Sequence, residues 1–186
     1  MPVKSNFASG DVLTASDTNT YLTNGGLVYI TEASIGTAVS SVVVSGCFSS
    51  TYDNYRIVVN VDSVAAGGPY STIQLGSTVT GYYWGMAGVV YSTAASAILA
   101  VNNGASWNRL GPLNTTGGSY SIDLLNPNRA LRTVITGNYA DFATAGSAGV
   151  GSGFLNDTTQ YTGFTLGLTS STMTGCKILV YGYRQA

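Results

Sequence analysis

The sequence predicts an all-β protein: a two-sheet antiparallel β-sandwich with jelly-roll-like connections, preceded by a short N-terminal arm that contains one short helix. Three observations predict this class. From residue 27 onward, apolar residues recur with a period of two, which is the period of a half-buried strand. Clusters of Gly, Asn and Pro interrupt this alternation at intervals of about 8–12 residues, as turns do in sandwiches. No segment after residue 26 shows the periodicity of a helix.

Residues 1–26 form the predicted arm. Ser9-Gly10-Asp11 is typical of a turn, and Thr14 to Asp17 offers an N-cap with an acidic residue three positions on. Asn24-Gly25-Gly26 would end a helix, so we expect a short helix over about Ala15 to Thr23. A helix this short is unstable alone and must dock, either on its own domain or on a partner. For docking on a partner the arm offers four apolar side chains, those of Val12, Leu13, Tyr21 and Leu22.

Residues 27–186 form the predicted β-sandwich domain. Alternation within four segments predicts which side chains face the core: Ile57, Val59, Ile122, Leu124, Phe164, Leu166, Ile178 and Val180. Further strands are expected over Leu27–Thr31, Ser40–Ser45, Ser71–Leu75, Tyr82–Tyr91, Ala97–Val101, Ser106–Leu110 and Leu131–Tyr139. Residues 141–153, rich in Ala, Gly and Ser, are expected to form a mobile surface loop. Its Gly149-Val150-Gly151-Ser152-Gly153 run is not a dinucleotide loop, because no helical pattern follows it.

Composition excludes several classes of function. Only 8% of the residues are charged, against about 25% in a typical soluble protein. The net charge is −1 with no cationic run, so we expect no nucleic-acid partner. The longest apolar runs fall far short of about 18 residues, so we expect no membrane insertion. A neutral surface is typical of extracellular adhesive proteins, yet the first ten residues lack the apolar stretch of a secretory signal. A virion protein, assembled in the host cytoplasm and released by lysis, reconciles these facts.

The residues that could carry chemistry favour a protein that is not an enzyme and holds no cofactor. There is no histidine, which excludes Ser-His-Asp and Cys-His nucleophiles and histidine-ligated zinc. A carboxylate pair for glycoside hydrolysis would have to come from isolated acids, for which solvated or turn-forming roles are favoured. These acids are Glu32, Asp53, Asp62, Asp123, Asp141 and Asp157. No spacing matches a calcium loop.

Aromatic residues are the remaining signal of a binding site. Tyr82, Tyr83, Trp84 and Tyr91 could form a surface patch on which sugars stack, although a β-core also uses such residues. Because neighbouring strand residues point to opposite faces, Tyr82 and Trp84 share one face and Tyr83 takes the other. The two cysteines, Cys47 and Cys176, are expected to be small buried side chains; a bridge between the first and last strands is the alternative, which cytosolic folding disfavours.

Four segments carry a resemblance to a known class of protein. The run Phe7-Ala8-Ser9-Gly10-Asp11-Val12-Leu13-Thr14-Ala15-Ser16-Asp17, with Asn19, Tyr21 and Leu22, resembles the start of many phage tail-fibre and virion proteins. The segments 48–59 (FSSTYDNYRIVV), 153–166 (GFLNDTTQYTGFTL) and 177–184 (KILVYGYR) resemble a β-rich domain that recurs in phage structural proteins, notably of aquatic phages. The resemblance implies that the N-terminal segment attaches to the particle and that the β-domain is displayed, often as a trimer. Such proteins serve as tail-fibre tips, receptor-binding modules or capsid decoration proteins.

We also expect self-association. A surface with few charges provides little repulsion between copies, and few Lys, Glu or Pro residues are available to protect the edge strands. A homo-oligomer is therefore expected, with the trimer as the form that the resemblance implies. The other expected partners are phage capsid, tail or baseplate proteins, and a host surface glycan if the domain is an adhesin.

Overall fold

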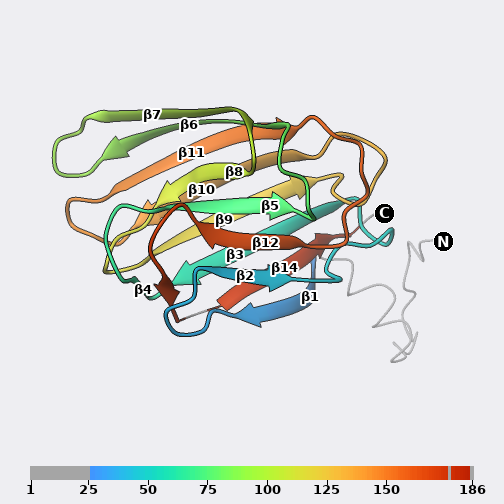
Figure 1. Ribbon diagram of the computed structural model, residues 1–186, viewed down its shortest axis with the longest axis horizontal. Coiled ribbons are helices and arrows are strands. Elements are labelled where there is room, and N and C mark those ends of the chain that lie inside the picture. Colours follow the sequence, from blue (N-terminus) through green and yellow to red (C-terminus); the bar gives the residue numbers. More distant parts are fainter. Residues whose placement is uncertain (1–25, 176, 185–186) are drawn as a thin grey trace, which may run out of the picture.

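Two antiparallel sheets packed face to face make up the described part of the chain, residues 26–175 and 177–184 of a computed structural model (Figure 1). The larger sheet has eight strands in the order β1-β14-β3-β9-β10-β11-β6-β7. In that order they span Leu27–Ser34, Lys177–Tyr183, Asn54–Val61, Gly118–Leu125, Val134–Asp141, Ser147–Leu155, Tyr82–Val90 and Ser96–Gly104.

The smaller sheet has the order β2-β12-β5-β8, with bounds Ser41–Val44, Phe164–Leu168, Tyr70–Leu75 and Trp107–Pro112. A short ladder joins β4 (Ser63–Val64) to β13 (Met173–Thr174). From β1 to β6 the chain alternates between the two main sheets, which is the jelly-roll-like feature, whereas β9, β10 and β11 form a meander within the larger sheet. The predicted all-β sandwich is therefore confirmed. The predicted N-terminal helix lies outside the described residues.

The core lies between the two sheets and contains the side chains that the alternation predicts. All eight predicted core residues are at most 2% exposed. Within the larger sheet Ile57 of β3 lies between Ile122 of β9 and Val180 of β14. From the smaller sheet Phe164 stacks on Phe48 with ring centroids 5.8 Å apart. The period-two pattern identified the buried face because each strand presents alternate residues to the core.

The predicted loop over residues 141–153 is wrong for residues 147–153, whereas residues 142–146 do connect β10 to β11. Residues 147–155 form β11, which is an interior strand paired with β10 on one side and β6 on the other. Its inward positions include Gly149, Gly151 and Gly153, and neighbouring groups occupy the space that side chains there would need. A Cβ atom on Gly151 would lie 2.4 Å from the Trp84 ring, and one on Gly149 would lie 2.7 Å from the Tyr139 ring. Glycine is therefore required by close packing under aromatic rings and is not a sign of a loop.

The outer face of the larger sheet is divided by charge. On one half, the Arg56 guanidinium donates two hydrogen bonds to the Asp123 carboxylate, at 2.8 and 2.7 Å, and the Tyr183 hydroxyl donates a third at 2.6 Å. Lys177 and Glu32 pair nearby at 2.7 Å. On the other half, β11, β6 and β7 contain no Asp, Glu, Lys or Arg. The charge depletion of the chain is thus concentrated at one end of the sheet.

Candidate binding surfaces

The four aromatic residues predicted to form a surface patch do not form one. Tyr82 is fully buried and Trp84 is 4% exposed, so both belong to the core. The Tyr82 hydroxyl accepts the Leu75 N–H at 2.8 Å, and burial raises the pKa of Tyr82. The Trp84 Nε1–H donates to the Arg109 carbonyl at 3.3 Å. The polar atoms of both rings have partners inside the domain, which is why burial is tolerated.

The other two predicted residues lie at opposite ends of β6. Tyr83 stacks on Phe154 of β11 at 4.9 Å with an interplanar angle of 10°. The Arg132 guanidinium covers the Phe154 ring at 5.9 Å. Tyr91 follows the end of β6 and is 47% exposed. The separation of Tyr83 from Tyr91 leaves no continuous aromatic platform among the four.

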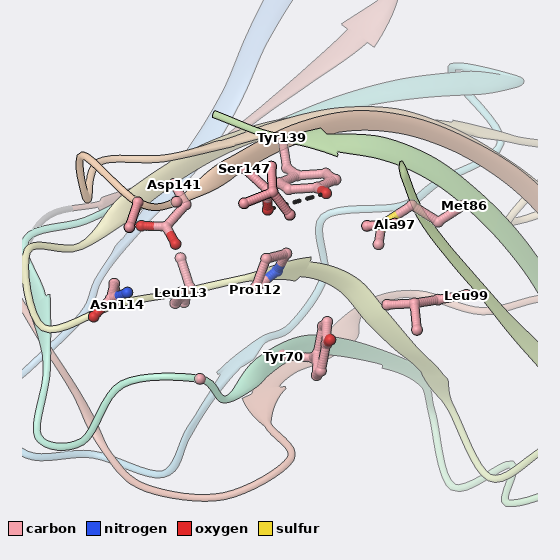
Figure 2. A pocket seen from close by; sticks show the side chains of 14 residues that line it. Tyr70, Met86, Ala97, Leu99, Pro112, Leu113, Asn114, Tyr139, Asp141 and Ser147 are labelled. Atoms are coloured by element: carbon pink, nitrogen blue, oxygen red, sulfur yellow. Dashed lines mark hydrogen bonds between the residues drawn. The ribbon is translucent and has the colours of Figure 1, made fainter. Parts of the chain in front are cut away.

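A cavity of about 240 Å³ lies among β6, β7, β8 and the turn between β10 and β11, and we call it the end cavity (Figure 2). Its apolar wall comes from Met86 of β6 and Leu99 of β7, and Pro112 of β8 closes the opposite side. Its polar end holds Asp141 and Ser147, from β10 and β11. Figure 2 shows these side chains converging on one space, with the Tyr139 hydroxyl 3.4 Å from the Ser147 Oγ atom.

Asp141 is the buried charged residue of this cavity, with 6% of its surface exposed. Its Oδ1 atom accepts the Ala143 N–H at 3.0 Å, which fixes the turn between β10 and β11. The sequence analysis considered Asp141 as an isolated acid at the start of a loop, whereas the structure places it, buried, at the end of β10. The alternation in β10 does indicate the buried position of Asp141. Ile135, Tyr139 and Asp141 lie an even number of positions apart and all point inward. An apolar wall beside a carboxylate suits a small molecule with one apolar face and a hydroxyl donor.

A second and larger depression, of about 490 Å³, lies over the start of β12 between the edge strand β2 and the turn after β5. Its volume falls within the range of about 300–1,000 Å³ that is common for small-molecule sites. Hydroxyl side chains predominate in its lining, and we call it the hydroxyl groove: Ser45, Ser77, Thr78, Thr159, Tyr161, Thr162 and Thr165. Among the described residues, no charged side chain lines it.

A hydrogen-bonded chain supports the floor of the hydroxyl groove. The Tyr161 hydroxyl donates to Asp157 Oδ2 at 2.7 Å and accepts from the Thr78 hydroxyl at 2.7 Å. These bonds hold the turn after β5 against the segment before β12. Hydrogen bonds from the Tyr161 hydroxyl, then from the Thr159 hydroxyl and backbone N–H, lower the pKa of Asp157 to about 2. At neutral pH Asp157 is therefore an ionised acceptor that organises the hydroxyls around it.

Most of the acids considered for catalysis are held in separate interactions. Asp53 pairs with Arg129 at 2.6 Å, and Glu32 pairs with Lys177. Burial acts to raise the pKa of Asp123, but the bonds from Arg56 and Tyr183 outweigh it and the pKa is lowered. Among the described residues no three His, Cys, Asp or Glu side chains gather in a way that could hold a metal ion.

The remaining sequence expectations concern the cysteines, membranes and the arm. Cys47 is a buried free thiol, and burial raises its pKa to about 12. Cys176 and the four apolar residues of the arm, Val12, Leu13, Tyr21 and Leu22, lie outside the described residues. Within the described part of the chain no helix is long and apolar enough to cross a membrane.

Comparison with known proteins adds no family. No protein-family model matches the chain, and no curated protein is significantly similar to it.

Proposed function

We propose that this chain is a non-enzymatic structural protein on the surface of a bacteriophage particle. Residues 1–26 attach it to other virion proteins of the capsid, tail or baseplate. Residues 27–186 are displayed as a short fibre or as a capsid decoration subunit. The protein assembles into the virion in the host cytoplasm as a homo-oligomer, for which the resemblance to phage proteins favours a trimer.

One observation carries this proposal: the three β-domain segments that resemble phage structural proteins meet in a single packed unit. The first and third contain β3 and β14, which pair through Val59 opposite Ile178. The second ends in β12 of the opposite sheet, where Phe164 stacks on Phe48 of the first segment. Tyr55 of β3 packs on the same Phe48 ring at 4.7 Å. The three segments that carry the resemblance therefore belong to one structural unit that spans both sheets, as expected if they derive from a single domain.

Labelling of intact particles tests the proposal. Antibodies raised against the purified chain should label particles at fixed positions in immunogold electron micrographs, and the labelled structure would assign the chain to head or tail. Purified, nuclease-treated particles that lack the chain by mass spectrometry would overturn the proposal.

A variant of the arm tests its role in attachment. Replacement of its four apolar residues, Val12, Leu13, Tyr21 and Leu22, by serine should leave the chain soluble but lower its copy number in particles, because the apolar contacts with the virion would be lost. Leu131→Ser is a matched control, since Leu131 is 50% exposed on the β-domain. Normal incorporation of the arm variant would show that these residues are not the anchor.

A second candidate function is glycan binding at the hydroxyl groove, as in a phage adhesin. Its lining of uncharged hydroxyls offers both donors and acceptors, which sugar hydroxyls require. The test is binding to an array of neutral and acidic oligosaccharides. Thr162→Val and Thr165→Val remove one hydroxyl each with little change of shape and should weaken any binding, while Thr136→Val on the outer face of the larger sheet should not. The absence of binding to the array, or equal binding by all variants, would exclude this groove as a glycan site.

A further inference from the structure

Strand β7 is the unprotected edge of the sandwich. Each of the other three edges of the two main sheets carries a feature that discourages pairing. The β1 edge has a register shift between Tyr29 and Thr31 and carries Glu32. The β2 edge is four residues long. The β8 edge ends in Pro112 and has Arg109 at a φ of 73°.

The β7 edge has none of these features over Ser96–Val101. This stretch pairs in regular register with β6, and the register shift comes only after Val101. It contains no proline, glycine or charged residue, and no Asp, Glu, Lys or Arg occurs anywhere between Asp62 and Arg109. Within the described residues β7 is the last strand of its sheet, at the upper rim in Figure 1. A regular, uncharged edge of this kind is a template for a further strand.

The backbone of β7 is poised to bond outward. Val90 donates to the Ala95 carbonyl across the turn, so residue 95 bonds toward β6. In an antiparallel ladder bonded and non-bonded pairs alternate, so the odd-numbered residues up to Val101 bond to β6. The N–H and C=O groups of Ser96, Ile98 and Ala100 therefore point to the free edge.

The side chains beside this edge are apolar and exposed. Ile98 is 77% exposed on the outer face, although strand residues of this type are usually covered. Its cross-strand neighbours on that face are Ala87 and then Val150, which is 62% exposed. The patch is neutral, so no charge on it would select an oppositely charged partner or repel an identical copy.

We propose that β7 pairs antiparallel with β7 of a second copy of this chain, about a two-fold axis at Leu99. In this register Ile98 of each copy lies opposite Ala100 of the other, so a large side chain packs beside a small one. Ala97 lies opposite Val101, and the two Leu99 side chains meet on the inner face. The contact is isologous, so the same surface of both copies is used and the larger sheets become continuous. This inference does not depend on the virion role. It predicts a dimer, whereas the resemblance to phage proteins implies a trimer.

Sedimentation of the full-length chain at micromolar concentration tests the contact, with a dimer as the expected species. Ile98→Lys should raise the dimer dissociation constant by about tenfold or more, because the apolar contact with Ala100 of the other copy would be lost and the two introduced cations would lie near each other across the axis. Val43→Lys is the matched control, since Val43 is 66% exposed on the other, four-residue edge and should leave the dimer unchanged.

A compensating variant tests the register. In Ile98→Lys/Ala100→Glu each introduced cation faces an introduced anion of the other copy, so the double variant should recover dimer that the single variant loses. A monomeric or trimeric wild type, or a dimer that Ile98→Lys leaves intact, would overturn the proposal. A weakened dimer that the double variant does not recover would overturn the register centred on Leu99.

Discussion

Replacement of Gly151 by alanine is the sharpest test of the interior strand that the sequence does not reveal. A Cβ atom there would lie 2.4 Å from the Cζ2 atom of Trp84 and 2.7 Å from the Gly85 carbonyl oxygen. The carbonyl belongs to the adjacent strand and cannot move without breaking the ladder. The Trp84 ring is 4% exposed and held through its Nε1–H, so it has little room to withdraw. Overpacking of this kind costs about 1–3 kcal/mol of the free energy of unfolding.

Gly85→Ala is the matched control for this measurement. Gly85 lies on the neighbouring strand, and a Cβ atom there would meet nothing within 4 Å. Both substitutions restrict the unfolded chain equally, so their difference isolates the overlap in the folded state; Gly85→Ala itself should be neutral or stabilise by about 0.4–1 kcal/mol. Urea unfolding gives both values from the midpoint and the slope. If Gly151→Ala were as stable as Gly85→Ala, residues 147–155 would not be packed under the Trp84 ring.

Two further predictions concern the core and the acid range. Ile122→Ala should lower the free energy of unfolding by about 2–5 kcal/mol, because Ile122 is 2% exposed in β9, between β3 and β10. The control Thr136→Ala, on the outer face, should change it by less than about 0.5 kcal/mol. Equal effects of the two variants in urea unfolding would contradict the assigned core. Asp157 has a folded pKa of about 2, below its ordinary value of about 3.9, so its ionised form stabilises the fold above about pH 4 and this contribution is lost as the pH falls toward 2. Asp157→Asn should therefore be less stable than the natural chain at pH 7 and nearly equal to it at pH 2 by thermal unfolding, whereas an equal deficit at both values would exclude the charge as the cause.

The alternation of inward and outward side chains along each strand explains how much of this fold can be predicted from sequence. In β3, β9, β12 and β14 the core is built from aliphatic and aromatic residues at alternate positions, so the sequence alone indicates both the strand and its buried face. In β11 the same face is built from Ser147, three glycines and Leu155, and the apolar material above it belongs to Trp84 and Tyr139 of other strands. A long-range contact of this kind leaves no periodic signal within the strand itself.

The candidate surfaces were harder to predict for a related reason. Three consecutive aromatic residues in β6 place rings on both faces of the strand, so the sequence did not indicate which face the smaller sheet covers. Because that sheet covers the face of Tyr82 and Trp84, a patch of consecutive aromatic residues could not exist on one surface. The hydroxyl groove combines β2, the turn after β5 and the segment before β12, which lie more than 30 residues apart from one to the next, so only the folded topology brings them together.

The glycine content and the charge depletion of this chain act together at one end of the larger sheet. Glycines at inward positions of β11 and β6 leave room for the rings of Tyr139 and Trp84, since a Cβ atom on Gly151 would overlap the Trp84 ring and one on Gly88 would meet the Tyr139 hydroxyl at 2.6 Å. Beyond β6 the larger sheet ends in β7, and the end cavity opens beside Met86 of β6 and Leu99 of β7. The edge strand of a sheet presents unpaired backbone N–H and C=O groups, and charged side chains are one of its usual protections. Here β6, β7 and β11 carry no charged residue. The end of the sheet that glycine packing builds is therefore also the end whose edge strand no charge protects.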